Sequence, residues 1–466
     1  MATVRNAGLL ELVSRGKKDV FFTNNPKNSF FHGVYMKSAS FTKEIHVTIP
    51  NNAPDWGKYV DFDIEQRGDI IKEFKIRLTL PTWLPPLAAR NNHKSVVTFE
   101  DGPSSSVGYT NLIGFYAIDK IQLFNDSLLI NEIHGEFLAW RFGQIASDVQ
   151  TAALAKSIGY YEESGLNISR TATTQTLYIP IPVLGHQLPN EPGLPLVAMK
   201  HTRLRMRVYL KKFEDLIVRY NSAGYVNYNS IFEKSINVQT SPSTTTMMTT
   251  IKKEELEKPT IALESTYLFV KPDIQVWLKS QRWRIPFYQV QRQEFTIEDN
   301  VMNAAYLSAA PVHIPLKLDF IGPCQRLFFG FQADGSRLAN ERNNYVSYDN
   351  QSFIQDAKLI VANIDRVVQN EPIVYQEVSD YWKNVRSTHS TNKTRFHTIA
   401  FGNLEDFQPS GTLNMTRAVQ PLLYLTLNRI GYDYRSGSRK TYCIVYAETW
   451  NIFEIENNIG KVLIDE

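Results

Sequence analysis

Short runs in which apolar and polar residues alternate are the feature that most constrains how this chain can fold. In residues 74–80, FKIRLTL, every second side chain is apolar, and residues 204–208, LRMRV, repeat the pattern. A period of two places all the apolar side chains on one face of a β-sheet. Further apolar runs that indicate strands lie at residues 266–270, 316–320, 326–331, 422–427 and 442–447. We therefore expect an all-β protein of the sandwich or barrel type.

Turn clusters separate these runs, and helical patterns are few. Residues 101–104, DGPS, and 408–411, QPSG, have the composition of tight turns. Residues 135–147 form the strongest candidate helix, and weaker candidates lie at residues 9–15 and from near Asp273 to Ser280. Aromatic residues make up 12% of the chain, with 26 Phe and 23 Tyr, which also favours β-structure.

The middle of the chain has the composition of a linker. Residues 240–250 read TSPSTTTMMTT and are followed by the charged IKKEELEKP, with comparable lengths of strand-rich sequence on either side. A chain of 466 residues is long enough for two β-domains of ordinary size. We expect an N-terminal arm over residues 1–26, a first domain over 27–215, a linker over 216–260, a second domain over 261–456 and a C-terminal tail over 457–466.

The charge and cysteine content narrow the functional class. The 50 basic and 47 acidic residues nearly balance, so the chain lacks the basic excess typical of nucleic-acid-binding proteins, and no direct contact with nucleic acid is expected. The two cysteines favour a reducing compartment. Residues 1–16 lack the apolar core of a signal peptide, and no run approaches the length of a membrane span. The sequence therefore indicates a soluble protein made in the cytoplasm.

No metal, cofactor or catalytic site is predicted. The nine histidines form neither an H-E-x-x-H nor an H-x-H pattern, so convergent ligands for zinc or iron are not indicated. No phosphate-binding loop or nucleophile elbow occurs. We therefore expect no enzyme activity, no catalytic residue, no cofactor-binding residue and no metal ligand.

Two charged strand faces are the strongest candidates for a functional role. Asp61, Asp63 and Glu65 alternate along one predicted strand. A glycosidase needs two carboxyls facing each other across a cleft, so three on one strand more often form a solvated face. A second face carries Arg203, Arg205 and Arg207. It could bind phosphate or glycan, but a solvent face or a salt-bridge surface between subunits is the favoured interpretation.

Several segments carry recognisable motifs along the chain. They are NNPKNSFF at 24–31, RGDII at 67–71, EIHGEFL at 132–138, LYIPIP at 177–182 with PGLPLVA at 192–198, QPSGTLNMTR at 408–417 and VYAETWNIF at 445–453. Taken together and in order, they resemble the major capsid proteins of nucleocytoplasmic large DNA viruses. Any one of the motifs is weak, but their number and order over residues 24–453 are specific. Some positions depart from the family pattern, for example Asn25 where the family usually has Gly.

The resemblance implies two tandem eight-stranded antiparallel jelly rolls with short helices in the loops, and a homotrimer that forms one pseudo-hexagonal capsomer. It implies a location in the icosahedral capsid shell of the virion, assembled inside the host cell. The implied partners are further copies of the chain, neighbouring capsomers and minor capsid proteins, with an internal viral membrane nearby. Long segments at 90–109 and 221–250 are expected to form loops on the outer face. The alternatives are a minor capsid paralogue of the same fold and a glycan-binding jelly-roll protein.

Overall fold

The structure is a computed structural model, and part of the chain is described in it. The described residues are 40–82, 95–99, 106–145, 154–161, 167–168, 171, 174–181, 193–221, 224–227, 235–240, 246–250, 256–378, 396–402 and 411–463; at 95–99, 142–145, 235–240 and 246–250 only the backbone is described. The chain divides into two compact units, Met1–Phe41 and Thr42–Glu466, and the second unit contains all the described residues except 40 and 41. The expected arm over residues 1–26 and the weak helix at 9–15 lie outside the described residues.

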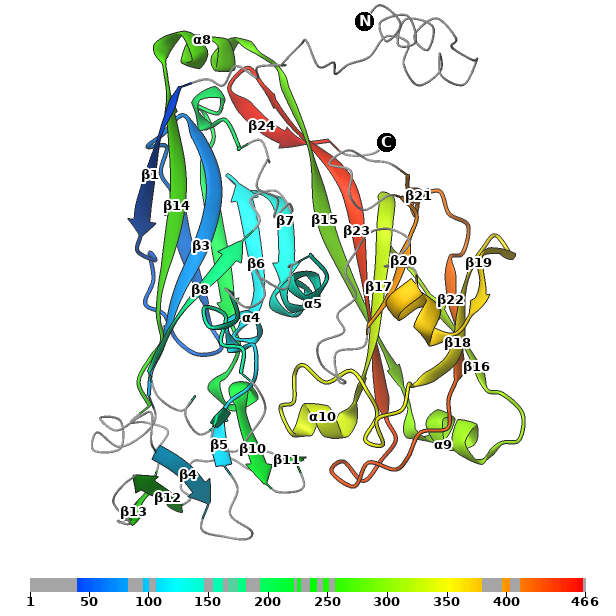
Figure 1. Cartoon of the computed structure of the whole chain (residues 1–466). Helices are drawn as coiled ribbons and strands as arrows, with labels where there is room; N and C mark the ends of the chain where they lie inside the picture. The colour runs from blue at the N-terminus through cyan, green and yellow to red at the C-terminus, as the bar shows by residue number, and fades with distance from the viewer. Residues whose placement is uncertain are drawn as a thin grey trace, which may run out of the picture. The chain divides into compact units, whose positions relative to one another are not determined.

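The first half of the chain forms two main antiparallel sheets (Figure 1). One has the strand order β1-β14-β3-β8 and the other has the order β2-β9-β6-β7. The alternating burial along β3 and β9 matches the alternation in their sequences, because the apolar side chains turn inwards. The strands are β1 (Phe41–Thr48), β2 (Tyr59–Ile64), β3 (Ile70–Leu80), β6 (Ile118–Asn125), β7 (Leu128–His134), β8 (Gln175–Ile181), β9 (Leu204–Leu210) and β14 (Thr260–Val270).

The second half repeats this arrangement. Its sheets have the orders β15-β23-β17-β20 and β16-β22-β18-β19, with β21 (Leu413–Asn414) attached to β17 and β24 (Ile459–Val462) attached to β23. The strands of the two main paths are β15 (Trp283–Ile297), β16 (His313–Lys317), β17 (Pro323–Ala333), β18 (Ile354–Val361), β19 (Ile364–Asn370), β20 (His397–Ala400), β22 (Leu422–Leu427) and β23 (Thr441–Glu456).

The two halves follow the same path through space. The strands of the two main sheets of each half can be numbered from first to last along the chain. In both halves, one sheet then contains the first, last, third and sixth strands in that order, and the other contains the second, seventh, fourth and fifth. This order is that of a jelly roll, in which strands paired far apart in sequence build two packed sheets. The prediction of an all-β chain with two tandem jelly rolls is therefore confirmed.

The predicted linker is not a simple connection. Residues 216–260 contain β10 (Ile217–Asn221), β11 (Gly224–Val226), β12 (Ser235–Thr240) and β13 (Thr246–Thr250). These strands join β4 (Ser95–Phe99) and β5 (Ser106–Tyr109) in one sheet of order β11-β10-β5-β4-β12-β13. The two long segments expected as loops, 90–109 and 221–250, therefore pair with each other. Threonine-rich sequence fits a strand because Thr is β-branched, although its Ser and Pro neighbours suggested a linker.

The boundary between the jelly rolls also differs from the predicted position. β14 was assigned to the second domain, but it pairs along its length with β3 of the first jelly roll. We therefore propose that the division falls at α8 (Pro272–Ser280), which connects β14 to β15. The predicted tail over 457–466 likewise contributes a strand, because β24 pairs with the end of β23. A jelly roll places its last strand beside its first and third, so the first sheet is incomplete without β14.

The helices are short and lie between strands. The predicted helices at 135–147 and 273–280 are confirmed as α5 (Gly135–Ile145) and α8, and α8 carries Pro272 in its first turn, where proline is tolerated. The other helices named here are α4 (Ile113–Tyr116), α9 (Asp299–Leu307) and α10 (Asp334–Leu338). Among the described residues no helix is both long and apolar enough to cross a membrane.

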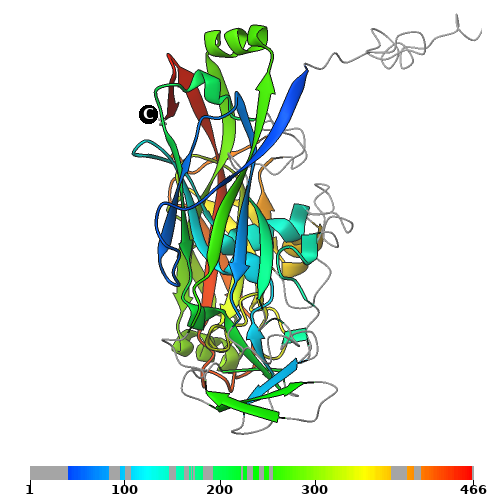
Figure 2. The ribbon, with the colours of Figure 1, turned by 90° about the vertical axis from the view of Figure 1, so that its left-hand side faces the viewer.

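The buried apolar residues form two main cores. The second core lies within the second jelly roll. The first core includes the interior of the first jelly roll and continues into side chains of β15, β17 and β23, such as Phe287, Phe328 and Tyr446. The two jelly rolls are thus joined by a continuous apolar junction. Figure 1 shows α5 on the side of the first jelly roll that faces the second, and Figure 2 shows the molecule from the side of β1.

Candidate functional site

The acidic and basic strand faces predicted from the sequence are neighbours in one sheet. β2 and β9 pair antiparallel in a register that sets Asp61 opposite Arg207 and Asp63 opposite Arg205. The Arg207 guanidinium donates two hydrogen bonds to Asp61, from Nε to Oδ1 at 2.7 Å and from Nη2 to Oδ2 at 2.9 Å. This bidentate pairing raises the pKa of Arg207. The two candidate faces therefore neutralise each other within the chain.

The other two carboxylates of the acidic face are also engaged by neighbours. Asp63 Oδ2 accepts a hydrogen bond from the Asn51 side chain at 3.0 Å, and Glu65 Oε2 accepts one from Arg67 Nε at 2.6 Å. The Arg67 guanidinium lowers the pKa of Glu65. A carboxyl that acts as a general acid near neutral pH needs a raised pKa, and Glu65 shows the opposite shift.

The remaining arginines lie on the same sheet. Arg203 lines a groove of about 570 Å³ that also contains Asp63 and Glu65, so cations and carboxylates are mixed there. The Arg205 guanidinium lies 5.0 Å from the ring centroid of Phe124, in a cation–π contact, and the backbone N–H of Arg203 donates to Asp126 Oδ1 at 3.1 Å. The Arg207 salt bridge lies within one chain. A solvent face or a salt-bridge surface between subunits stays the prediction for the rest of this face.

The histidines in the described part of the chain do not gather with other ligands. No group of three His, Cys, Asp or Glu side chains in the described residues could hold a metal ion. His397 is buried, its Nδ1 lies 3.2 Å from the Phe329 carbonyl oxygen, and its Nε2 lies 3.0 Å from Gln376 Nε2. Burial lowers the pKa of His397 to about 4, so it is a neutral core residue. His32, His93, His186 and His389 lie outside the described residues.

A partly buried carboxylate, which lies in no catalytic motif, links the two jelly rolls. Glu136, in the first turn of α5, accepts hydrogen bonds from Tyr345 Oη at 2.9 Å and from Tyr446 Oη at 2.8 Å. Both tyrosines belong to the second jelly roll. α5 can begin here because Gly135 has no Cβ, which would otherwise lie against the carbonyl oxygens of Phe115 and Ile118.

Charge and burial at this junction favour a fixed network. Burial and the nearby Glu136 carboxylate raise the pKa values of Tyr345 and Tyr446, so both hydroxyls remain donors. The Arg292 guanidinium lies 3.9 Å from Glu136 Oε2 and also pairs with Glu294. The two buried tyrosine hydroxyls share this partly buried carboxylate, which also has a nearby cation, so breaking this network is expected to destabilise the junction.

An aromatic cluster packs beside the Glu136 network. The ring of Trp140, one turn further along α5, lies 5.1 Å from the ring centroids of Tyr345, Phe396 and Tyr446. It stacks on Phe396 and meets the two tyrosines edge to face, which are the favoured geometries for aromatic pairs. Gly330 of β17 faces the indole and leaves room for it. The cluster adds apolar contact to the polar network.

A second charged group is buried at the same junction. Glu448 of β23 lies 3.4 Å from Arg326 Nε of β17 and 3.3 Å from Arg141 Nε of α5. Arg141 comes from the first jelly roll and the other two residues from the second. Because a buried carboxylate that loses its cations is costly, this triad favours one fixed arrangement of the two jelly rolls.

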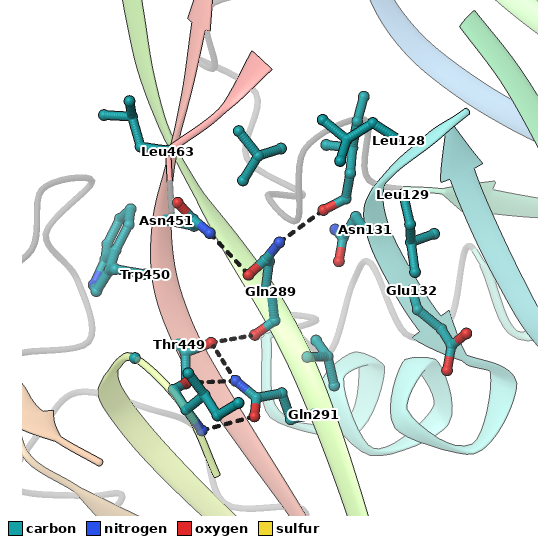
Figure 3. A pocket seen from close by; sticks show the side chains of 15 residues that line it. Leu128, Leu129, Asn131, Glu132, Gln289, Gln291, Thr449, Trp450, Asn451 and Leu463 are labelled. Atoms are coloured by element: carbon teal, nitrogen blue, oxygen red, sulfur yellow. Dashed lines mark hydrogen bonds between the residues drawn. The ribbon is translucent and has the colours of Figure 1, made fainter. Parts of the chain in front are cut away.

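A groove at the junction has an apolar rim and a polar floor (Figure 3). It has a volume of about 430 Å³ and is lined mainly by β7, β15 and β23. Gln289 on its floor donates to the Ile130 carbonyl at 2.8 Å and accepts from Asn451 at 3.0 Å. Glu132 lies at the rim, where hydrogen bonds led by His134 hold its pKa at about 2. The polar groups of the floor therefore serve the contact between the jelly rolls.

Two family models match the chain in order. One, described as the major capsid protein N-terminus, matches residues 29–256, and the other, described as the large eukaryotic DNA virus major capsid protein, matches residues 286–461. The two matches fall on the two jelly rolls. The chain belongs to the major capsid protein family of nucleocytoplasmic large DNA viruses.

Relatives of this capsid family match over nearly the whole chain. The major capsid protein of Pyramimonas orientalis virus is 23% identical, with 97% of this chain and 98% of the relative covered. Probable capsid protein 4 of Acanthamoeba polyphaga mimivirus is 19% identical, with coverage of 98% and 99%. The predicted resemblance is confirmed. The predicted location is confirmed as well, because major capsid proteins form the capsid shell of the virion.

Solved capsid structures share the fold. A chain of the PBCV-1 virus capsid has a TM-score of 0.69 at 15% identity, covering 94% of this chain and all of the other. The Faustovirus major capsid protein has a TM-score of 0.62 at 13% identity, covering 95% and 94%. At these identities the likeness is one of fold, and it confirms the double jelly roll.

The junction could be found in the sequence only in part. The segment EIHGEFL, which contains Glu136, was among the motifs of the capsid family resemblance, but nothing in it indicated a partner. Tyr345 and Tyr446 lie far along the chain and carry no motif for such a contact. The role of Glu136 in joining the jelly rolls follows only from the fold.

Proposed function

We propose that this chain builds the icosahedral shell of a large double-stranded DNA virus as homotrimeric capsomers with a pseudo-hexagonal outline. The observation that supports the proposal is the repeated strand order, which gives one chain two jelly rolls of the same topology. Membership in the capsid family supports a role in the shell, and the repeated jelly roll supports the proposed geometry of the capsomer.

The repeat of two jelly rolls in one chain favours a trimer for a geometric reason. A shell made largely of six-coordinated positions needs tiles with six similar edges. One chain with two jelly rolls supplies two such edges, so three chains supply six. Cyclic symmetry makes a trimer economical, because one repeated interface closes the ring.

The junction within the chain is suited to this role. A capsomer with six similar edges requires the two jelly rolls of each chain to keep a constant relation. Glu136 with its two tyrosines, the Trp140 cluster and the Glu448 triad all cross from one jelly roll to the other. Specific contacts of this kind between the two jelly rolls favour one arrangement over others.

The remaining parts of the proposal concern location and partners. The protein would act in the virion after assembly in the host cell, in contact with neighbouring capsomers and minor capsid proteins and close to an internal membrane. It would act without a cofactor, a metal, a catalytic residue or direct contact with nucleic acid. The pairing of Asp61 with Arg207 supports a structural role for the charged strands.

The mass of the purified protein tests the proposal. Static light scattering at micromolar concentration should give three times 53.5 kDa. A stable monomer or dimer under these conditions would contradict the trimer. Imaging of the same sample on a grid tests assembly, because trimers of this outline should form hexagonally packed sheets.

A further inference from the structure

Four exposed tyrosines make up a tyrosine row at one end of the second jelly roll. Tyr432 and Tyr434 lie in the connection between β22 and β23, Tyr306 lies on α9, and Tyr348 lies between α10 and β18. In that order they are 39%, 79%, 42% and 49% exposed. Figure 1 shows α9 at the end of the second unit away from α8, the end that also holds β12 and β13. Three segments far apart in the sequence therefore bring aromatic rings to one surface.

The rings of the tyrosine row contact one another directly or through an arginine. The Tyr434 ring centroid lies 5.6 Å from that of Tyr432 and 6.1 Å from that of Tyr348, and both pairs are close to perpendicular. The Arg439 guanidinium lies 4.1 Å from the ring centroid of Tyr306 and 5.4 Å from that of Tyr432, so it connects these two rings by cation–π contacts. The row is therefore a continuous aromatic surface.

The connection that carries Tyr432 and Tyr434 is held in a fixed conformation. Asp433 and Ser438 form a β-bridge, and the Gly437 N–H donates to the Asp433 carbonyl at 2.9 Å. The Tyr432 hydroxyl donates to the Gly437 carbonyl at 2.5 Å. Gly437 has a φ of 67°, a conformation that favours glycine. A surface that is fixed before binding loses little conformational entropy when it takes up a ligand.

The two arginines beside the tyrosine row already have partners within the chain. The Arg435 guanidinium donates to Glu341 at 2.9 Å and to both carboxylate oxygens of Asp433 at 3.0 Å. The Arg439 guanidinium donates to Asn303 Oδ1 at 2.5 Å. These hydrogen bonds hold both cations against the protein, so the row favours a neutral ligand over an anion.

We propose that the tyrosine row binds a neutral carbohydrate chain of β-linked sugars. In a β-linked glucan every ring hydroxyl is equatorial, so both faces of each sugar ring present C–H groups that can stack on an aromatic ring. The distances of 5.6 and 6.1 Å between neighbouring ring centroids are close to the length of one sugar unit in an extended chain. Tyrosine suits such a ligand, because its rigid apolar ring carries a hydroxyl that can bond to the sugar hydroxyls. This binding site goes beyond the proposed role in the shell.

Isothermal titration calorimetry of the purified full chain with cellohexaose tests the proposal. The unmodified chain should bind the sugar, and Tyr434→Ala should weaken binding about tenfold or more, because Tyr434 lies at the centre of the row. Tyr434→Phe keeps the ring and should bind within about threefold of the unmodified chain. The matched control is Tyr178→Ala, since Tyr178 is 42% exposed but lies on β8 of the first jelly roll, and its binding should not change.

Each other outcome would overturn the proposal. Cellohexaose that does not bind, or that binds Tyr434→Ala as tightly as the unmodified chain, would show that the tyrosine row is not the site. Tighter binding of a heparin hexasaccharide would indicate a site for anions instead.

Light scattering separates this site from the proposed function. A carbohydrate site leaves the mass of the assembly the same in Tyr434→Ala as in the unmodified chain. A lower mass in this variant would show that the row contacts another copy of the chain, and would overturn the carbohydrate site while leaving the proposed trimer standing.

Discussion

Replacing Gly330 with alanine tests how closely the aromatic cluster fills the junction. A methyl carbon at this position would lie 2.9 Å from Trp140 Cη2 and 3.0 Å from Cζ2, whereas carbon atoms in good contact lie about 3.5 to 4.0 Å apart. The indole has no free direction of retreat, because Tyr345, Phe396 and Tyr446 all have ring centroids 5.1 Å away. We expect Gly330→Ala to lower the free energy of unfolding by about 2 kcal/mol through overpacking.

A second substitution should relieve part of this loss. Trp140→Phe alone removes part of a buried indole and should cost about 2 kcal/mol. In the double variant the smaller ring leaves room for the methyl group at position 330. The combined loss should therefore be smaller than the sum of the two single losses by about 1 kcal/mol or more.

Urea unfolding followed by far-ultraviolet circular dichroism, at one fixed protein concentration, measures these differences without relying on tryptophan fluorescence. The matched control is Trp277→Phe, since Trp277 is about half exposed on α8 and distant in sequence from the cluster. Its effect should add to that of Gly330→Ala. An unchanged urea midpoint in Gly330→Ala would contradict close packing at this position. So would losses from Gly330→Ala and Trp140→Phe that add as fully as those from Gly330→Ala and Trp277→Phe.

Three other perturbations follow from the structure. Burial lowers the pKa of His397 from 6.5 to about 4, so stability present above pH 6.5 should fall by about 3 kcal/mol as the pH drops to 4; urea titrations of His397→Gln should lose this slope in that window. Gly411→Ala should cost about 1 to 3 kcal/mol, because a Cβ there would lie 2.6 Å from the Phe401 carbonyl oxygen; an unchanged melting temperature would argue against that close approach. Glu136→Ala should cost about 2 kcal/mol, because it removes the acceptor of the buried Tyr446 hydroxyl and leaves Tyr345 with the Tyr116 hydroxyl, 3.2 Å away, whereas Asp63→Ala on the exposed strand face should cost under about 1 kcal/mol; equal losses in thermal unfolding would contradict the junction network.

The local pattern of apolar and polar residues predicted the strands and the two main helices well. When one face of a sheet is buried, every second residue of its strands is apolar, and this alternation can be recognised in the sequence. β3 and β9 show this most clearly, since every inward residue is apolar. One strand was misplaced: the apolar run at 316–320 predicted a strand, but β16 covers His313–Lys317. Leu318 and Phe320 lie beyond the end of β16 and are buried. They are apolar because they belong to the core, although they are not part of the strand.

Long-range pairing accounts for what the sequence could not predict. The sequence placed β14 in the second domain because the polar, threonine-rich stretch before it suggested a boundary, whereas its pairing partner, β3, lies nearly 200 residues earlier. The salt bridge between Asp61 and Arg207 depends on the register of β2 and β9, which composition does not reveal. The sequence resembled the capsid family strongly enough to predict the fold, but not the contacts that join its two halves.

Two-dimensional averages from electron micrographs of the purified protein test the central claim most directly. If three chains close a ring through their jelly rolls, views along the axis should show six similar densities with threefold symmetry. Particles with two densities, or rings with another symmetry, would contradict the account of this chain as the subunit of a trimeric capsomer.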